Sequence, residues 1–177
     1  MSNIKSKGSE SLIFIDESGA NLQMHPLYGR ALGKERAVLT APHHPGNQIT
    51  MIGAISQHKI EASMYGKWAA NTEIFTHFIT HYLAPILTPC HTVIMDNVQF
   101  HKSKSVHHEI VKTGAALLFF PPYSPELNPI EEMWSKIKSI LRKLQARTMR
   151  AFKKAIKVAF NSVNATDLIG WFKNAGY

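Results

Sequence analysis

Apolar residues occur in short unbroken runs at three places in the chain, a pattern typical of strands that are covered on both faces of a sheet. The runs are Leu12–Ile15, Thr92–Met95 and Ala115–Phe120. The first two lead directly into an acidic residue, Asp16 and Asp96 respectively. An amphipathic segment over Ser103–Lys112 separates the last two runs, so we predict a βαβ unit with parallel strands.

Two further runs, rich in Ile and Met, predict a hairpin. They cover Gln48–Ser56 and Ile60–Tyr65, and three polar residues separate them. Together with the first strand they predict an antiparallel meander of three strands. The expected fold class is therefore α/β, with a mixed sheet of this meander and the parallel strands, flanked by helices.

Apolar residues at helical spacing predict the flanking helices. One begins after Asn71 and ends at Pro85 or shortly after it. A second covers Thr148–Val163, and a short one begins at Thr166. The remaining helix has the best-defined start, and it lies in the proline-rich segment, which we define as Pro121–Pro129.

This helix start gives Glu131 two interpretations. Asn128 is a favoured N-cap residue, and Pro129 suits the first helical position because its φ is preset. Asn128 followed by Glu131 fits a capping box, in which the Glu side chain bonds back to the cap amide. Alternatively, Glu131 is a functional carboxylate. Only residues elsewhere in the chain decide between the two.

The length of 177 residues and the hydrophobic content of 45% are enough for one domain with a sizeable core. We expect a polar N-terminal tail over residues 1–10 and a single domain over residues 11–177. The single cysteine excludes a disulfide framework and a multi-cysteine zinc site. The sequence contains no secretion signal and no membrane-spanning run, so we expect a soluble, cytoplasmic protein.

Positive charge is concentrated towards the C-terminus. Residues 133–177 contain ten Lys and Arg against one Asp, whereas residues 1–132 are nearly balanced. Such a block favours a polyanionic partner, DNA before an acidic membrane surface, although a merely solvated helix face also explains it. The candidate DNA-binding residues are Arg30, Lys34, Arg36, Lys136, Lys138, Arg142, Arg150, Lys153, Lys154 and Lys157.

Three acids stand out by position: Asp16 and Asp96 at strand ends, and Glu131 at a helix start. Ligands in open α/β sheets gather at the carboxyl ends of strands, so the two Asp residues become neighbours if their strands do. Clustered carboxylates repel one another unless a cation lies between them. Oxygen ligands of this kind suit Mg²⁺ or Mn²⁺, and a pair of such ions supports phosphodiester cleavage and transfer.

The motifs that contain these acids are Phe14-Ile15-Asp16-Glu17, Met95-Asp96-Asn97 with His101, and Pro122-Tyr123-Ser124-Pro125-Glu126-Leu127-Asn128-Pro129-Ile130-Glu131 with Trp134 and Lys138. They resemble the motifs of the DDE transposases of mariner type, in particular the bacterial insertion-sequence branch. Thirty-four residues separate Asp96 from Glu131, which is the spacing of that branch. The resemblance covers about residues 11–145.

The resemblance implies a ribonuclease H-like catalytic domain in which Asp16, Asp96 and Glu131 bind two Mg²⁺ or Mn²⁺ ions. It implies an enzyme that cleaves phosphodiester bonds at element ends and transfers the 3′ strand to target DNA, as a homodimer on DNA. Glu131 then becomes a metal ligand, with Glu132 as an alternative that the spacing disfavours. The accessory residues would be Glu17, Asn97, His101 and Asn128.

The accessory residues have separate expected roles. Glu17 and Asn97 shape the site, and Asn97 holds water or a carboxylate. His101 either donates to phosphate or is structural. Asn128 still caps the helix through its own side chain.

The sequence departs from the family pattern at its start. Family members usually carry a helix-turn-helix DNA-binding region, and here only residues 1–10 precede the first strand. We therefore expect a split, frameshifted or truncated transposase, with a separate helix-turn-helix subunit or a frameshift-fused N-terminal region as partner. The alternatives are a catalytically silent DNA-binding remnant and a ribonuclease H-like nuclease or resolvase, which shares the metals but not the motif ending in Glu131.

Overall fold

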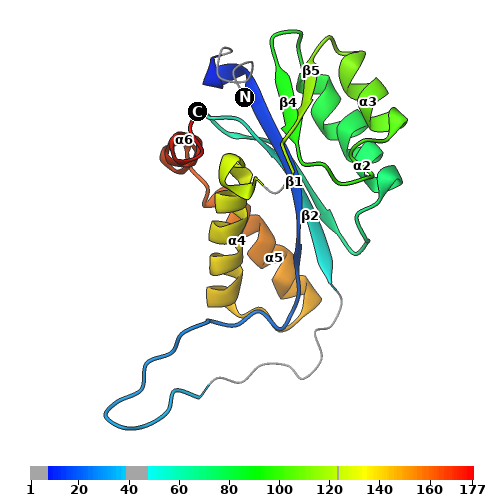
Figure 1. The fold of residues 1–177 in the computed structure, drawn as a ribbon. Coiled ribbons are helices and arrows are strands. Elements are labelled where there is room, and N and C mark those ends of the chain that lie inside the picture. Colours follow the sequence, from blue (N-terminus) through cyan, green and yellow to red (C-terminus); the bar gives the residue numbers. More distant parts are fainter. Residues whose placement is uncertain (1–7, 39–47, 123) are drawn as a thin grey trace.

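The computed structural model describes residues 8–38, 48–122 and 124–177. Residues 1–7 of the predicted tail and Tyr123 of the proline-rich segment lie outside the described residues. Five strands form one sheet in the order β3-β2-β1-β4-β5 (Figure 1). The strands are β1 Leu12–Ala20, β2 Ile49–Ile55, β3 Ile60–Gly66, β4 Thr92–Met95 and β5 Ala116–Phe119.

The sheet is mixed, as predicted. β1, β2 and β3 pair antiparallel, and β4 pairs parallel with both β1 and β5. A short turn joins β2 to β3, which fits their antiparallel pairing, whereas a connection containing a helix joins the parallel strands β4 and β5. The predicted meander and the predicted βαβ unit are both confirmed.

β1 is longer than predicted and continues through Asp16 to Ala20. These polar residues stay in the strand because β2 pairs with them, with Gly53 opposite Asp16 and Ile49 opposite Ala20. In the parallel pairing of β1 with β4, the last pair is Phe14 with Ile94. Two residues further along the same register, Asp16 lies level with Asp96. The predicted strand end at Asp16 is therefore wrong, yet the two acids lie side by side.

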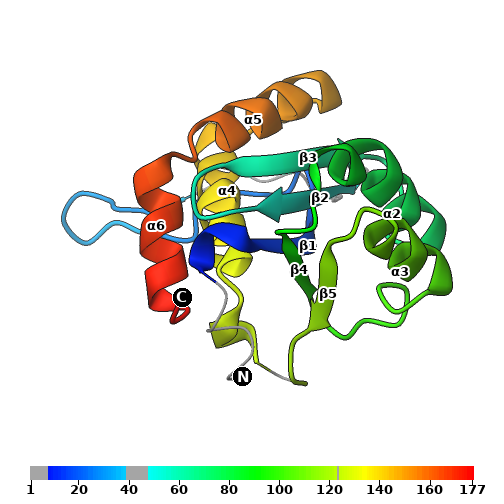
Figure 2. The ribbon, with the colours of Figure 1, turned by 90° about the horizontal axis from the view of Figure 1, so that it is seen from above.

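Two groups of helices cover opposite faces of the sheet (Figure 2). On one face lie α2 Thr72–Phe78, which a π turn and a 3₁₀ turn continue to Ile86, and α3 Lys104–Val111. On the other lie α4 Ile130–Leu144, α5 Met149–Asn161 and α6 Ala165–Asn174. Each face has its own core: Phe14 packs under α4, α5 and α6, whereas Ile13 and Ile15 pack under α2 and α3, because successive strand side chains alternate.

The start of α4 differs from the prediction. The helix begins at Ile130 after Pro129, and the side chain of Asn128 makes no capping bond. The preceding residues, Pro125–Leu127, form a 3₁₀ turn in which the Asn128 N–H donates to the Pro125 carbonyl at 3.0 Å. In a capping box, the Glu131 side chain would accept a hydrogen bond from this same Asn128 N–H. The predicted capping role of Asn128 is therefore wrong, and so is the capping-box interpretation of Glu131.

The other predicted helix starts are capped by side chains. Asn71 accepts from the Ile74 N–H at 2.9 Å, and Thr148 accepts from the Ala151 N–H at 3.2 Å. α6 begins one residue before the predicted Thr166, because a capping box forms at Asn164. Within the described ranges, no helix has the length and apolarity that crossing a membrane requires.

Candidate active site

Asp16, Asp96 and Glu131 line one cavity, although they come from β1, from the end of β4 and from the first turn of α4. The cavity has a volume of about 510 Å³. Asn97 and Asn128 line it as well, and parts of the proline-rich segment complete its wall. The fold thus gathers the three acids of the sequence motifs around one space.

Asp16 lies in the most enclosed position of the three, with 9% of its surface exposed. Its Oδ2 accepts a hydrogen bond from the indole N–H of Trp134 at 3.0 Å. Burial raises the pKa of Asp16 to about 7, and the charges of Glu17, Glu131 and Asp96 add to the rise. Ionising Asp16 is therefore unfavourable unless positive charge is placed nearby.

Asp96 and Glu17 are joined by a buried histidine. The Nδ1 atom of His101 lies 2.6 Å from Asp96 Oδ1, and its Nε2 atom lies 3.0 Å from Glu17 Oε2. Burial opposes the charged imidazolium, but the hydrogen bonds to Asp96 and Glu17 raise the pKa of His101 to about 9. Burial also acts against ionised Asp96, yet the bonds from His101 and from the Val98 N–H hold the pKa of Asp96 below its usual value.

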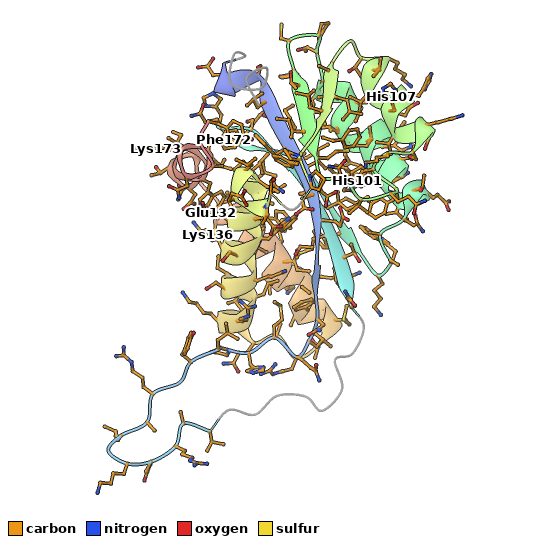
Figure 3. The ribbon with its side chains drawn as sticks, viewed as in Figure 1. His101, His107, Glu132, Lys136, Phe172 and Lys173 are labelled. Atoms are coloured by element: carbon orange, nitrogen blue, oxygen red, sulfur yellow. The ribbon has the colours of Figure 1, made fainter. Side chains whose placement is uncertain are left out.

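Adjacent residues of β1 point to opposite faces of the sheet, as the alternation of a strand requires. Asp16 contacts Trp134 of α4. Glu17 instead contacts His101, whose ring packs on Phe75 of α2 with the ring centroids 4.2 Å apart. His101 lies on the α2 and α3 side of the sheet (Figure 3). Because its side chain is fully buried, the structural alternative for His101 is favoured over phosphate contact.

Two neighbours of the acids are engaged elsewhere. The side-chain amide of Asn97 donates to the Phe120 carbonyl, which ties the end of β4 to the start of the proline-rich segment. Glu132 accepts a hydrogen bond from Asn174 at 3.1 Å, on the side of α4 that faces α6 (Figure 3). Of the two adjacent glutamates, Glu131 is therefore the one at the cavity.

The donor set of the cavity fits Mg²⁺ or Mn²⁺, because carboxylate and amide oxygens are the ligands these cations prefer. The buried Oδ1 atom of Asn128 has no hydrogen-bond partner within the described part of the chain. In the same part of the chain, no three His, Cys, Asp or Glu side chains are arranged to hold an ion as they stand. The Glu131 side chain is exposed, so the packed core does not hold its carboxylate in place.

The predicted DNA-binding residues lie on three parts of the structure. Exposed on the outer face of α5 are Arg150, Lys153, Lys154 and Lys157. Exposed in the segment after β1, which extends beyond the C-terminal end of α4 (Figure 1), are Arg30, Lys34 and Arg36. Half-buried on α4 are Lys136, Lys138 and Arg142. Lys136 forms an ion pair with Asp167 of α6, so it is less available to phosphate than the α5 residues.

The pKa values predict how stability depends on pH without added metal. The pKa of Asp16 is raised to about 7 and that of His101 to about 9, so the folded chain binds both protons more tightly than the unfolded chain. The stabilisation from Asp16 is complete below about pH 4 and lost towards pH 7, and that from His101 is lost between about pH 6.5 and 9. The melting temperature should therefore fall as the pH rises from about 5 to 9.

Thermal denaturation in EDTA at a series of pH values checks this, with Asp16→Asn as the comparison. The variant cannot titrate at residue 16, so its melting temperature should change less than that of the wild type between about pH 5 and 7. The same fall in both proteins over that range would show that Asp16 has an ordinary pKa.

The sequence places Trp134 in the motif of Glu131 and, by helical spacing, in the core, where it is 1% exposed. It does not predict the bond from Trp134 to Asp16. Two signals are consistent with such a bond: Trp134 lies three residues after Glu131, hence on the same side of the helix, and a buried indole N–H needs an acceptor.

The sequence was compared with known families and with curated proteins. The sequence profile of the DDE superfamily endonucleases matches residues 11–153. No curated protein matches the sequence significantly.

Solved structures of Mos1 mariner transposase share the fold. A pre-cleavage Mos1 transpososome aligns over 97% of this chain and 55% of its own, with a TM-score of 0.79 and 13% identity. The Mos1 mariner paired-end complex with Mn aligns over 97% of this chain and 54% of its own, with a TM-score of 0.79 and 14% identity. The Mos1 catalytic domain aligns over 97% of this chain and 80% of its own, with a TM-score of 0.68 and 13% identity. This chain spans about half the length of the Mos1 chains in the two complexes, and the predicted ribonuclease H-like fold is confirmed.

Proposed function

Because this chain belongs to the DDE superfamily of endonucleases, we propose that it is the catalytic part of a mariner-type DNA transposase from the bacterial insertion-sequence branch. It cleaves phosphodiester bonds at element ends and transfers the 3′ strand to target DNA. The observation that carries the proposal is the single cavity lined by Asp16, Asp96 and Glu131, the three acids of the family motifs.

Asp16, Asp96 and Glu131 would hold two Mg²⁺ or Mn²⁺ ions. When bound, such ions activate the attacking oxygen and stabilise the leaving oxygen of a phosphodiester. Mos1 catalytic-domain structures solved with Mg and with Mn support this choice of metals. The buried Asn128 amide oxygen at the cavity would add a neutral oxygen to the three carboxylates, and His101 keeps one oxygen of Asp96 in place.

The proposed reaction has two displacements at phosphorus. In the first, a water oxygen bonds to the phosphorus, the P–O3′ bond breaks, and the water proton ends on the 3′ oxygen. The products are a 3′ hydroxyl and a 5′ phosphate. In the second, that 3′ hydroxyl attacks a phosphodiester of the target, and a target 3′ oxygen leaves with a proton. The residues at the cavity orient the reacting groups for both displacements.

DNA would approach along α5, where four basic side chains are exposed on one helix face. We expect the triple variant Lys153→Ala, Lys154→Ala, Lys157→Ala to weaken DNA binding for all sequences alike. The slope of log affinity against log salt concentration should become shallower by about 3, or roughly 1 for each phosphate that a lysine no longer neutralises. Fluorescence anisotropy with duplex DNA at several salt concentrations measures the slope.

The control removes positive charge from the opposite face of the sheet, with Lys104→Ala and Lys112→Ala. Lys104 is the first residue of α3 and Lys112 directly follows its last residue, so the slope should stay near that of the wild type. A slope for the α5 variant that is no shallower than the slope for this control would remove α5 from the DNA-binding surface.

The partners of the chain follow from the same proposal. Transposition joins two element ends, so we propose a homodimer on DNA. Because the chain spans about half the length of the Mos1 chains, we propose that a helix-turn-helix region outside these 177 residues recognises the element ends, in a separate subunit or a frameshift-fused N-terminal region.

The test is incubation of the purified protein with Mn²⁺ and either duplex element ends or an RNA–DNA hybrid of the same sequence. Cutting of the duplex ends to leave 3′ hydroxyls that join to a target plasmid is the expected result. Preferential cutting of the hybrid would favour a ribonuclease H-like nuclease or resolvase. DNA binding without cutting, and without calorimetric binding of Mn²⁺, would favour a catalytically silent remnant.

A further inference from the structure

The carboxylates of the site come from two separate parts of the fold. Asp16 and Asp96 belong to the sheet, whereas Glu131 belongs to α4. For the three to act together, α4 must be held at a fixed position relative to β1. The bond between the Trp134 indole N–H and Asp16 Oδ2, 3.0 Å long and buried, joins these two elements at the site.

The helix geometry links this bond to Glu131. Trp134 follows Glu131 by three residues, which is just under one helical turn, so both side chains lie on the same side of α4. The indole ring is 1% exposed and packs edge-on against Phe160 of α5, with the ring centroids 6.1 Å apart. A fixed ring on the helix therefore sets the distance from Glu131 to the strand.

The strand next to β1 leaves space for the ring. Gly53 of β2 pairs directly with Asp16. A Cβ atom at Gly53 would lie 3.0 Å from Cη2 of Trp134 and 3.1 Å from Cε of Met133, tighter than an ordinary van der Waals contact. The absence of a side chain at Gly53 is what lets the indole approach the sheet closely enough to reach Asp16.

We infer that Trp134 is a positioning residue that orients Asp16 for metal binding and fixes Glu131 relative to it, with Gly53 providing the space for the indole. The inference rests on the proposed function. An indole suits this role because its N–H donates a hydrogen bond but it has no lone pair with which to bind a metal. It holds one carboxylate oxygen without competing for the ion.

The test is the Trp134→Phe variant, which keeps an aromatic ring in the core and deletes the N–H donor. Trp171→Phe is the matched control, because Trp171 belongs to the same core but lies on α6. Mn²⁺ affinity is measured by calorimetry, and the Mn²⁺ concentration for half-maximal DNA cleavage is measured in parallel. We expect Trp134→Phe to weaken Mn²⁺ binding roughly 10- to 100-fold, the usual effect of removing a partner of a metal ligand, and Trp171→Phe to bind as the wild type does.

A merely structural role would lower the melting temperature of Trp134→Phe without moving its Mn²⁺ dependence, and that result would overturn the inference. Gly53→Ala provides a second variant that retains the indole but displaces it, and we expect a smaller shift in the same direction. Unchanged Mn²⁺ affinity in both variants would also overturn it. Wild-type protein that binds Mn²⁺ but does not cut DNA would contradict the proposed function, while the affinity comparison would still decide the role of Trp134.

Discussion

Replacing Glu131 by Gln is expected to reduce metal-dependent DNA cleavage by at least about 100-fold, whereas Glu132→Gln should leave most of it intact. Removing a partner of a metal ligand already costs roughly 10- to 100-fold, so removing the ligand should cost at least as much. The two residues are adjacent, equal in charge and both in the first turn of α4. Only Glu131 lines the cavity, since Glu132 bonds Asn174.

The measurement is the rate of strand cleavage of duplex DNA at saturating Mn²⁺. Melting temperatures of both variants serve as the control for folding, and both should stay close to the wild type because neither side chain is buried. Strong loss of activity in Glu132→Gln with normal activity in Glu131→Gln would exchange the two roles and refute the assigned ligand.

The second large effect is expected for His101→Phe. Phenylalanine retains a ring against Phe75 and Phe100 but removes both N–H donors, leaving the carboxylates of Asp96 and Glu17 without them. Hydrogen bonds to charged groups contribute roughly 1.5–3 kcal/mol each. The Asp96 side chain is 42% exposed, so solvent compensates in part, and we expect a loss of about 2–4 kcal/mol.

For a domain of this size that loss lowers the melting temperature by roughly 5–15 °C. Cleavage should also fall, by roughly 10- to 100-fold, because Asp96 loses the group that orients it. His107→Phe is the control, since His107 is an exposed histidine on α3 (Figure 3). A melting temperature and rate for His101→Phe equal to those of the control would show that the bridge between Asp96 and Glu17 is unimportant.

The sheet could be predicted from the sequence because its signals are local. Unbroken apolar runs mark the strands, and a turn or a helix between two runs decides whether they pair antiparallel or parallel. The length of β1 could not be predicted in this way. The residues of its second half, Asp16–Ala20, are polar or small, and they form a strand only because β2 pairs with them. Local residue propensities give no information about this pairing.

The helix start at the site shows a second limit. Asn128 has the right residue type and position for a cap. Its N–H, however, donates to the Pro125 carbonyl within the turn over Pro125–Leu127, and its side chain is buried at the cavity. Glu131 lies at the cavity, and its role as a ligand stays a prediction, whereas the capping rule fails at Asn128. Local rules fail here because the segment is shaped by the site and not by the helix alone.

The hydrogen bonds that support the acids are the part that sequence alone could not supply. Trp134 and Asp16 are 118 residues apart, and Glu17 and His101 are 84 apart. Finding these pairs requires the order of strands, the face of each side chain and the rotation of α4 at once. Periodicity predicts the buried face of each element, but the order of strands and the rotation of α4 are properties of the packed core.

The most direct test of the proposed metal site is anomalous diffraction from crystals grown with Mn²⁺. We expect Mn²⁺ peaks in the cavity of about 510 Å³, with oxygens of Asp16, Asp96 and Glu131 at roughly 2.1 Å, the distance typical of the similarly coordinated Mg²⁺. The exposed Glu131 side chain should have turned towards the ion. Ordered carboxylates with no anomalous peak between them at saturating Mn²⁺ would contradict the assignment of these three acids as a metal site.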